Sequence, residues 1–476
     1  LNIIFLYNQE QYDINGPTTL FSSLPQRKQG VAGRVSYSYD GRYYIEGNFG
    51  YNGSENFAKG HRFGFFPSIA VGYNISNEKF WQPIKPVISN LKIRGSWGLV
   101  GNDATNAGRF AYMEDLVLGG SDSYTTGIRQ DTYYSGPSWN RYFNPDLTWE
   151  VGEKINLGLD LQLFNDFNLT FDIFREKRRD IFMTRENSIP EIVGTGETKI
   201  TSNNGEMENK GLDLAIDYNK QITKDFFLSF KSTLTFARNK VLKMDEPPYF
   251  EYPGLSDVGH PLGTYWGYVA DGLFPDQETI DNSPRQDLGY TPQPGDIKYV
   301  NQPNAKGEYD NVINSNDRVA IGHPYDPELV YGFGPSMKWK NWDFSFFFQG
   351  VARTSFMMYG MHPFGTTSIK NMLQFVADDH WSVDNPNPNA AYPRLTKDSN
   401  GNNDQYSTYW LRNAAFLKLK NAEIGYTYKG MRFYLSGVNL LTFSPFKHWD
   451  PEMGGGNGLY YPTQRVFNIG FQMTIQ

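Results

Sequence analysis

The chain has 476 residues, with 44 Lys and Arg against 51 Asp and Glu, a net charge of −7 and no cysteine. This acidic balance argues against a nucleic-acid-binding protein, which needs a basic surface. The lack of cysteine excludes disulfides, zinc–thiolate sites and thiol nucleophiles. No apolar run approaches the roughly 18 residues that a membrane-spanning helix needs. A chain of this length forms either several domains or one large all-β unit.

Apolar and polar residues alternate along most of the chain. In one stretch Leu157, Leu159 and Leu161 alternate with Gly158 and Asp160. Successive side chains of a strand point to opposite faces, so each such segment has one apolar and one polar face. The alternation predicts about 14 strands, over residues 1–9, 30–39, 43–52, 62–74, 88–100, 149–163, 168–180, 207–219, 225–240, 328–340, 342–353, 411–428, 431–441 and 463–475.

The predicted strands and their connections favour a membrane barrel. Most strands have about ten residues or more, the length that a tilted strand needs to cross a bilayer. Short links follow most even-numbered strands, whereas the long links, 101–148, 181–206, 241–327, 354–410 and 442–462, follow odd-numbered strands. Outer-membrane barrels have short periplasmic turns and long outer loops. Because lipid cannot satisfy free backbone N–H and C=O groups, such a sheet has to close.

Tyrosines gather near the predicted strand ends, where an aromatic girdle meets the lipid headgroups. These are Tyr37, Tyr39, Tyr51, Tyr73, Tyr218, Tyr426 and Tyr428. Cross-strand packing of rings in a soluble sheet is the alternative. The parity of the links favours the girdle.

Several stretches resemble the C-terminal half of the SusC/RagA-like transporters, which are TonB-dependent outer-membrane transporters of Bacteroidetes. They are NPDLTWEVGEKINLGLDLQLF (144–164), NNGEMENKGLDLAIDY (203–218), GHPLGTYWGYVADGLF (259–274), PGDIKYVN (294–301), DRVAIGHPYDPELVYGFG (317–334), WLRNAAFLKLKNAEIGYTY (410–428) and LSGVNLLTFSPFKHWDPE (435–452). The resemblance covers nearly the whole chain, with the blocks in the same order. Composition and alternation alone do not identify this family.

The resemblance implies an all-β fold in which residues 1–476 supply the last 14 or so strands of a 22-stranded antiparallel transmembrane β-barrel. The plug, the TonB box and the first strands are expected to lie outside this chain, which begins at Leu1 without a visible signal peptide. The family imports bulky nutrients, glycan oligosaccharides or peptides, across the outer membrane. Its partners are TonB and a SusD-like surface lipoprotein that closes as a lid. The links 101–148 and 181–206 would face that lid.

Candidate binding residues come from the loops and from the polar strand faces. Loop aromatics can pack on the C–H face of a sugar ring or on a peptide; they are Trp139, Tyr265, Trp266, Trp381 and Trp449. Alternatively, these rings anchor the loops on one another. The polar phase of the strands, expected to face the lumen and a plug, includes Arg34, Glu46, Lys92, Arg94, Asp160, Asp213, Asp217 and Lys231.

Little in the sequence indicates enzyme chemistry or a metal. The six histidines, His61, His260, His323, His362, His380 and His448, show no zinc spacing, and no G-x-S-x-G motif occurs. We therefore expect a non-enzymatic protein without a cofactor. Asp296, Asp310 and Asp317 leave a calcium loop open, but they lack the compact ligand run of known calcium loops. A solvated polar loop is the favoured interpretation.

Two other functions remain open at this stage. The first is a self-contained 14-stranded porin or channel. The second is a secreted β-rich glycan-binding module or hydrolase. Burial of Leu157 and Phe471 inside a two-layer core would favour the soluble module, whereas exposure of both would favour the membrane barrel.

Overall fold

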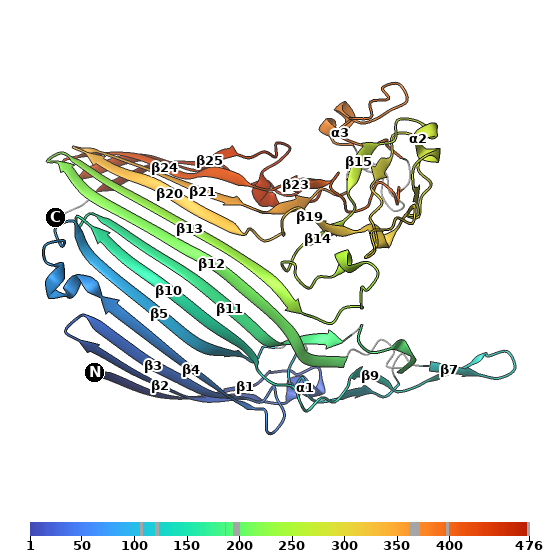
Figure 1. Cartoon of the computed structure of the whole chain (residues 1–476), viewed down its shortest axis with the longest axis horizontal. Coiled ribbons are helices and arrows are strands. Elements are labelled where there is room, and N and C mark those ends of the chain that lie inside the picture. Colours follow the sequence, from blue (N-terminus) through green and yellow to red (C-terminus); the bar gives the residue numbers. More distant parts are fainter. Residues whose placement is uncertain are drawn as a thin grey trace. The chain divides into compact units, whose positions relative to one another are not determined.

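The computed structural model describes residues 1–104, 108–119, 123–185, 187–193, 200–360, 372–396 and 399–473. Fourteen long strands form one sheet in chain order, and every pair with a defined register is antiparallel. The strands, labelled in Figure 1, are β1 (Asn2–Tyr12), β2 (Gln26–Tyr39), β3 (Tyr43–Ser54), β4 (Phe63–Asn74), β5 (Ile88–Asn102), β10 (Glu150–Leu163), β11 (Phe167–Arg185), β12 (Ile200–Thr223), β13 (Phe226–Lys243), β20 (Leu329–Trp339), β21 (Trp342–Ala352), β24 (Phe416–Tyr428), β25 (Met431–Phe443) and β26 (Val466–Met473).

All 14 predicted strands are present, and the predicted all-β class is confirmed. Several boundaries differ from the prediction. The strands predicted over 168–180 and 207–219 extend to Phe167–Arg185 and Ile200–Thr223, so the link expected over 181–206 is much shorter. The strand predicted over 30–39 begins at Gln26, and the strand predicted over 411–428 begins only at Phe416. Ala414 N donates instead to Thr354 O at 3.1 Å, and Ala415 N donates to Asn413 Oδ1 at 2.9 Å. These bonds turn the backbone out of the ladder, and Leu411–Asn413 form a separate short strand, β23.

Residue contacts divide the chain into two compact units. Unit 1 comprises Leu1–Leu212 and Asn239–Pro247, and unit 2 comprises Asp213–Arg238 and Pro248–Gln476. In both units short turns join the strands at one end. Asp40 and Gly41 in unit 1 and Lys429 and Gly430 in unit 2 all have positive φ. This backbone geometry is that of tight hairpin turns, whose twist matches the twist of the strands.

The links at the other strand ends carry short helices and strands of their own. In unit 1 these are α1 (Leu20–Ser23), β6 (Asp115–Val117), β7 (Ser123–Thr126), β8 (Thr132–Ser135), β9 (Ser138–Arg141) and η3 (Glu191–Val193), while η1 (Ile75–Asn77) and η2 (Lys79–Trp81) lie in the medium-length link after β4. In unit 2 they are η4 (Pro253–Leu255), β14 (Tyr265–Gly267), β15 (Ala270–Leu273), α2 (Gln277–Asp281), β16 (Arg285–Gln286), β17 (Ile297–Tyr299), β18 (Val312–Ile313), η5 (Ser315–Asp317), β19 (Val319–Ile321), β22 (Ser355–Met357), α3 (Gln374–Asp378), β23 and η6 (Pro451–Met453).

Opposite residues in the ladders separate an apolar face from a polar face. One row of direct partners runs Tyr37, Ile45, Val71, Gly95, Leu157 and Ile173. The neighbouring row runs Ser36, Glu46, Ala70, Ser96, Asn156 and Phe174. Leu157 and Phe471 are each 55% exposed, so neither lies in a two-layer core. An apolar sheet face left open in this way is suited to lipid contact.

Aromatic side chains form rows on the apolar face near the turns. In unit 2 a row of ladder partners runs Phe226, Trp339, Trp342, Tyr426, Phe433 and Phe471. The Trp342 and Tyr426 ring centroids are 4.8 Å apart, and those of Phe433 and Phe471 are 5.0 Å apart. In unit 1 Tyr43 stacks on Tyr73 at 5.1 Å. No helix among the described residues is long and apolar enough to span a membrane.

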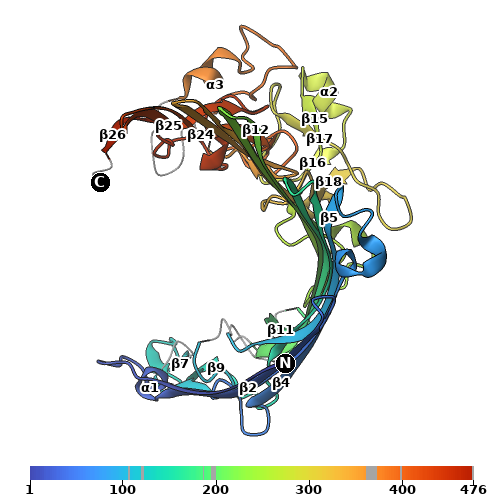
Figure 2. The same cartoon turned by 90° about the vertical axis from the view of Figure 1, so that its left-hand side faces the viewer.

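Most fully buried side chains lie in the loops rather than on the strands. In unit 1 Phe57, Phe66, Ala111, Leu147 and Trp149 form a small core beneath the links. In unit 2 a larger loop core holds Tyr268, Leu273, Ile297, Tyr299, Ile313, Ile321, Phe356, Met357, Met358, Val376, Trp381, Ala390, Tyr392, Trp410, Ala414 and Phe446. Figures 1 and 2 both show β15, α2 and α3 of unit 2 gathered together. These loops are therefore folded and can hold side chains in fixed positions.

Candidate functional site

A buried polar network fixes the segment 400–404 against β17 in the loop core of unit 2. The Asp296 side chain is completely buried, and its Oδ1 accepts hydrogen bonds from Asn400 Nδ2 at 3.0 Å and Asn403 Nδ2 at 2.9 Å. Asn403 Oδ1 accepts from the backbone N–H of Ile297 at 2.9 Å, and Asn402 Nδ2 donates to Ile297 O at 2.9 Å. Buried polar groups that are satisfied in this way make the backbone around them rigid.

The charge of Asp296 is only partly compensated. Its Oδ2 accepts from Gln293 N at 2.8 Å, and Arg394 Nη1 lies 3.9 Å away. Burial raises the pKa of this carboxyl above its usual value, although the hydrogen bonds and Arg394 oppose that shift. The charged form is thus held at a cost that the surrounding amides reduce.

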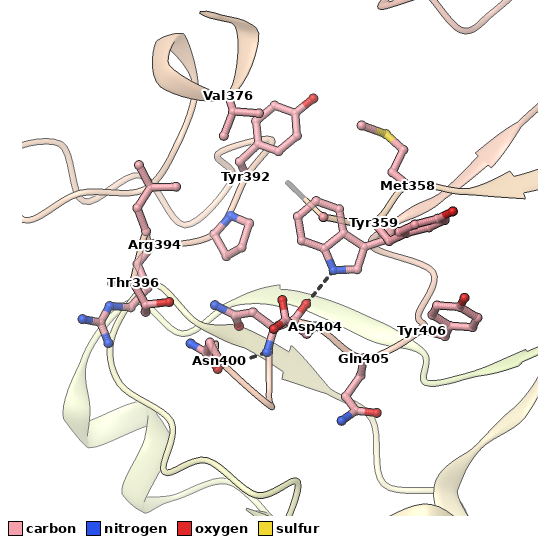
Figure 3. Close-up of a pocket in the computed structure, with 15 residues that line it drawn as sticks. Met358, Tyr359, Val376, Tyr392, Arg394, Thr396, Asn400, Asp404, Gln405 and Tyr406 are labelled. Atoms are coloured by element: carbon pink, nitrogen blue, oxygen red, sulfur yellow. Dashed lines mark hydrogen bonds between the residues drawn. The ribbon is translucent and has the colours of Figure 1, made fainter. Parts of the chain in front are cut away.

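A cavity of about 220 Å³ lies beside this network. Figure 3 shows Val376 and Tyr392 on one side of it, Asn400 and Asp404 opposite them, and Tyr359 and Tyr406 at one flank. Its lining consists of Met358, Tyr359, Gly360, Val376, Tyr392, Pro393, Arg394, Leu395, Thr396, Asn400, Asn403, Asp404, Gln405, Tyr406 and Trp410. Aromatic rings and amides together are the usual lining of a small-molecule site.

The five aromatic residues singled out from the sequence lie in different surroundings. Trp381 is 7% exposed and belongs to the loop core. Tyr265 and Trp449 pack against this core. Trp266 Nε1 donates to Asp257 Oδ1 at 2.6 Å, and its ring meets His260 edge-on. Trp139, on β9 of unit 1, is 36% exposed and stacks on Tyr142. None of the five lines the cavity.

The polar-face residues of unit 1 pair with one another across the strands. Arg34 forms an ion pair with Glu46. Arg94 Nη2 lies 2.6 Å from Asp172 Oδ2, and Arg94 Nε lies 3.4 Å from Asp160 Oδ2. Lys92 Nζ lies 4.7 Å from the centroid of the Tyr44 ring. The ladder register places Lys92, Arg94 and Asp160 on the same face as Glu46.

The polar-face residues predicted in unit 2 are less connected. Asp213 Oδ1 accepts a hydrogen bond from Thr235 Oγ1 at 2.7 Å. Lys231 lies opposite Gly334 in the ladder, and Asp217 lies on β12. On other strands of unit 2, Arg432 of β25 pairs with Asp343 of β21 and Glu423 of β24, a cluster whose sequence spacing gave no signal. Whether these faces line a lumen remains a proposal.

Of the three acidic residues considered for calcium, Asp296 belongs to the buried network described above, and Asp310 and Asp317 serve local turns. Asp317 accepts from Gln302 N at 2.7 Å and from Asn314 N at 2.8 Å. Asp310 accepts from Val312 N at 3.0 Å. Within the described ranges no three His, Cys, Asp or Glu side chains gather as metal ligands. His362 lies outside the described residues.

Sequence reasoning missed the residues that do line the cavity. Tyr359, Tyr392 and Tyr406 fall in segments without alternation. In the network beside the cavity, Gln286 hydrogen bonds to Asn402, which is 116 positions away in the sequence. The run NGNND at 400–404 was the available signal, as a cluster of amides in a segment flanked by Tyr392 and Tyr406. Amide-rich segments usually form solvated turns, so this run by itself does not predict a buried network.

Comparison with known proteins identifies the fold. The family described as "TonB dependent receptor-like, beta-barrel" matches residues 3–440. The chain belongs to this family. It is 29% identical to the TonB-dependent receptor SusC of Bacteroides thetaiotaomicron over 93% of the chain and 43% of that protein, and 27% identical to the TonB-dependent receptor P3 of Formosa agariphila over 93% and 45%.

Solved structures agree with this assignment. The RagAB peptide importer matches in its closed-closed state with a TM-score of 0.72 at 22% identity, over 96% of this chain and 49% of the other. Its open-open state matches with a TM-score of 0.73 at 21% identity, over 97% and 49%. The chain spans about half the length of the curated relatives it matches.

These matches confirm the expected SusC/RagA-like, outer-membrane β-barrel assignment. The family is one of TonB-dependent receptors and not of enzymes, as the sequence predicted. The secreted hydrolase or binding module is thereby set aside.

Proposed function

We propose that this chain forms the C-terminal barrel wall and outer loops of a TonB-dependent importer of bulky nutrients, oligosaccharides or peptides. The observation that carries the proposal is the contrast between the strand ends within each unit. One end has tight turns, and the other has links with their own buried cores. Long folded loops at the outer face are suited to hold a large ligand before it enters the barrel.

In this proposal residues 1–476 supply part of a 22-stranded receptor. The remaining strands, a plug and a TonB-interacting segment would come from outside these residues. The polar strand faces would then surround the plug, with Arg34, Lys92, Arg94 and Asp160 among its neighbours. In unit 1 this face carries ion pairs between Arg34 and Glu46 and between Arg94 and both Asp160 and Asp172. A mixed, internally paired wall suits contact with a folded plug better than a wide ion-selective pore.

We also propose a SusD-like surface lipoprotein as the lid. Supporting this, the link between β5 and β10 carries a hairpin, β7–β8, whose Tyr124 and Tyr134 rings stack at 5.2 Å. Both rings are exposed, and Ile128 at the tip is fully exposed. Tyrosine and isoleucine exposed together on a projecting hairpin are typical of a protein-binding surface.

Loop aromatics that stay accessible are proposed to contact the nutrient or the lid. Trp139 is the best placed, because its ring is partly exposed and it belongs to the same link as the β7–β8 hairpin. Trp266 is half-buried and held by Asp257. Tyr265, Trp381 and Trp449 would act mainly by holding the loops in place.

The test uses the complete receptor in its native bacterium. A deletion strain is complemented with the complete gene, and uptake of fluorescent oligosaccharides and peptides is measured with and without TonB. Uptake is expected only with both the receptor and TonB. Co-purification with a surface lipoprotein should fall in a Tyr124→Ser/Tyr134→Ser variant but not in a Tyr309→Ser control, since Tyr309 is exposed in unit 2. Uptake that persists without the receptor or without TonB would contradict the proposal.

A further inference from the structure

We propose that the 220 Å³ cavity in the loop core of unit 2 is a carbohydrate subsite that takes one neutral pyranose unit of an oligosaccharide. This inference rests on the proposed import function and names the ligand class of one site within it. At roughly 30 Å³ of liquid volume per water, the cavity holds about seven waters. That space suits a single hydroxylated ring and not a whole oligomer.

The aromatic lining combines two buried rings, Tyr392 and Trp410, with two exposed rings, Tyr359 and Tyr406. Trp410 Nε1 donates to Asn403 O at 2.7 Å, and Tyr392 OH lies 3.2 Å from His448 Nε2. The polar atoms of these two buried rings are thus occupied by the protein. Tyr359 and Tyr406 stand at the flank of the cavity and are 52% and 48% exposed. Aromatic faces beside a wet cavity match the C–H face of a pyranose.

The charges of the lining favour a neutral ligand. The two charged side chains among the lining residues are Arg394 and Asp404, of opposite sign. Arg394 Nη1 donates to Gln293 Oε1 at 2.6 Å, and Asp404 Oδ2 accepts from Ser399 Oγ at 2.9 Å. An anionic sugar or a charged peptide terminus would have to compete with these bonds and with buried Asp296 behind Arg394. A hydroxyl group can donate or accept without displacing either bond.

The walls are fixed before a ligand arrives. Asn400 and Asn403 anchor one wall to Asp296, and Gln405 Nε2 donates to Gly401 O at 2.7 Å within the same segment. Trp410 is held by Asn403. A preformed cavity avoids the entropy of ordering its walls upon binding, which otherwise weakens affinity.

Further tyrosines extend from the flank of the cavity. Tyr359 hydrogen bonds to Tyr460, and both rings lie close to Gly456. Burial, together with the nearby hydroxyls of Tyr325 and Tyr406, raises the pKa of Tyr265 to about 12. Tyr325 and Tyr460 are 60% and 56% exposed. Neighbouring units of an oligosaccharide therefore have rings to rest on outside the cavity.

The experiment titrates the purified complete receptor by calorimetry. The probes are maltoheptaose, xylohexaose, laminarihexaose and chitohexaose as neutral oligosaccharides, trigalacturonate as an anionic one, and a tryptic digest of casein as peptides. At least one neutral oligosaccharide is expected to bind. Tyr406→Ala and Tyr359→Ala should each weaken that binding by about 3- to 10-fold, the loss of one ring contact. Tyr406→Phe should restore it, and Tyr309→Ala should leave it unchanged.

The inference is overturned if no neutral oligosaccharide binds, if Tyr406→Ala and Tyr359→Ala leave the affinity within twofold of the unaltered receptor, or if only the casein peptides or trigalacturonate respond to these changes. The import proposal fails separately. If binding depends on Tyr406 but the bound sugar is never taken up by cells, the subsite stands and the import function does not.

Discussion

Lys418 Nζ lies 2.6 Å from Asp450 Oδ2, and the Lys418 side chain is completely buried. Glu452, which belongs to η6, also has its Oε2 atom 2.6 Å from Lys418 Nζ. The three residues tie β24 to the link that follows β25. A buried cation is tolerated only when carboxylates compensate it, and removal of one partner leaves an uncompensated buried charge.

Replacing Lys418 should therefore loosen this link more than replacing an exposed lysine. We expect Lys418→Met to lower the stability of unit 2 by about 1–3 kcal/mol, because Asp450 and Glu452 lose the charge-assisted hydrogen bonds that Lys418 donates. Hydrogen exchange of residues 444–465 in the complete receptor measures the effect. Lys429→Met, in an exposed turn, is the matched control and should have no effect on that segment. Equal exchange in both variants would show that the ion pairs do not hold the link.

The same cluster predicts sensitivity to acid. Burial raises the pKa of Asp450, but hydrogen bonds from Lys418 and Thr463 outweigh burial, and the resulting pKa is below the ordinary value. A carboxyl with a lowered folded-state pKa contributes stability above its unfolded pKa of about 3.9 and loses it as the pH falls through the folded value. Exchange of residues 444–465 should thus accelerate below about pH 4. An Asp450→Asn receptor should lack this step, and a step that persists would assign it to another group.

Asp296 should show the opposite dependence. Burial raises its pKa, so its contribution to stability is greatest below the unfolded pKa and is lost as the pH rises through the folded value. We expect the amides of segment 400–404 to lose protection as the pH rises above the unfolded pKa of about 3.9. Asp296→Asn should remove this pH dependence while costing about 1–3 kcal/mol, because a donor then faces the Gln293 N–H. Asp287→Asn, at an exposed carboxyl, is the control and should retain the pH dependence.

The strands were predictable because each carries its own signal. Leu157 and Phe471 follow a local alternation, and no distant contact is needed to place them on the apolar face. The loop core is different, because Gln286, Asn402 and Ile297 meet through bonds that span about a hundred positions of sequence. No local pattern records such a pairing.

The loop aromatics show the same limit in another way. The sequence around an isolated Trp in a link does not tell whether its side chain will be buried. Trp381 is buried in the loop core, whereas Trp139 stays partly exposed. The strand start at Phe416 was missed for a related reason. The hydrogen bond from Ala414 N to Thr354 O involves a residue just after β21, about 60 positions earlier in the chain. The alternation around Ala414 does not reveal such a partner.

Charge placed on the apolar face should be far more damaging than charge on the polar face. Leu157 is exposed in the middle of β10, and Asn156 precedes it on the opposite face. We expect Leu157→Arg to cost about 2–4 kcal/mol if lipid covers this position. Asn156→Arg is the matched control and should assemble normally. The measurement is the amount of heat-modifiable receptor in outer-membrane fractions, and equal amounts of both variants would argue against lipid contact at Leu157.

Gly101 on β5 lies where the ring of Phe66 packs across the strand ladder. A Cβ at Gly101 would overlap this ring, and Phe66 is buried edge-on against Trp149 at 5.3 Å. We expect Gly101→Ala to lower stability by about 1–3 kcal/mol, the usual cost of overpacking. Gly47→Ala is the control, since its Cβ would meet nothing within 4 Å. Thermal unfolding of the complete receptor in detergent compares the two. Adding Phe66→Leu to Gly101→Ala should recover part of the loss, because the smaller side chain relieves the overlap. A melting temperature for Gly101→Ala equal to that of Gly47→Ala would show that Phe66 moves aside freely.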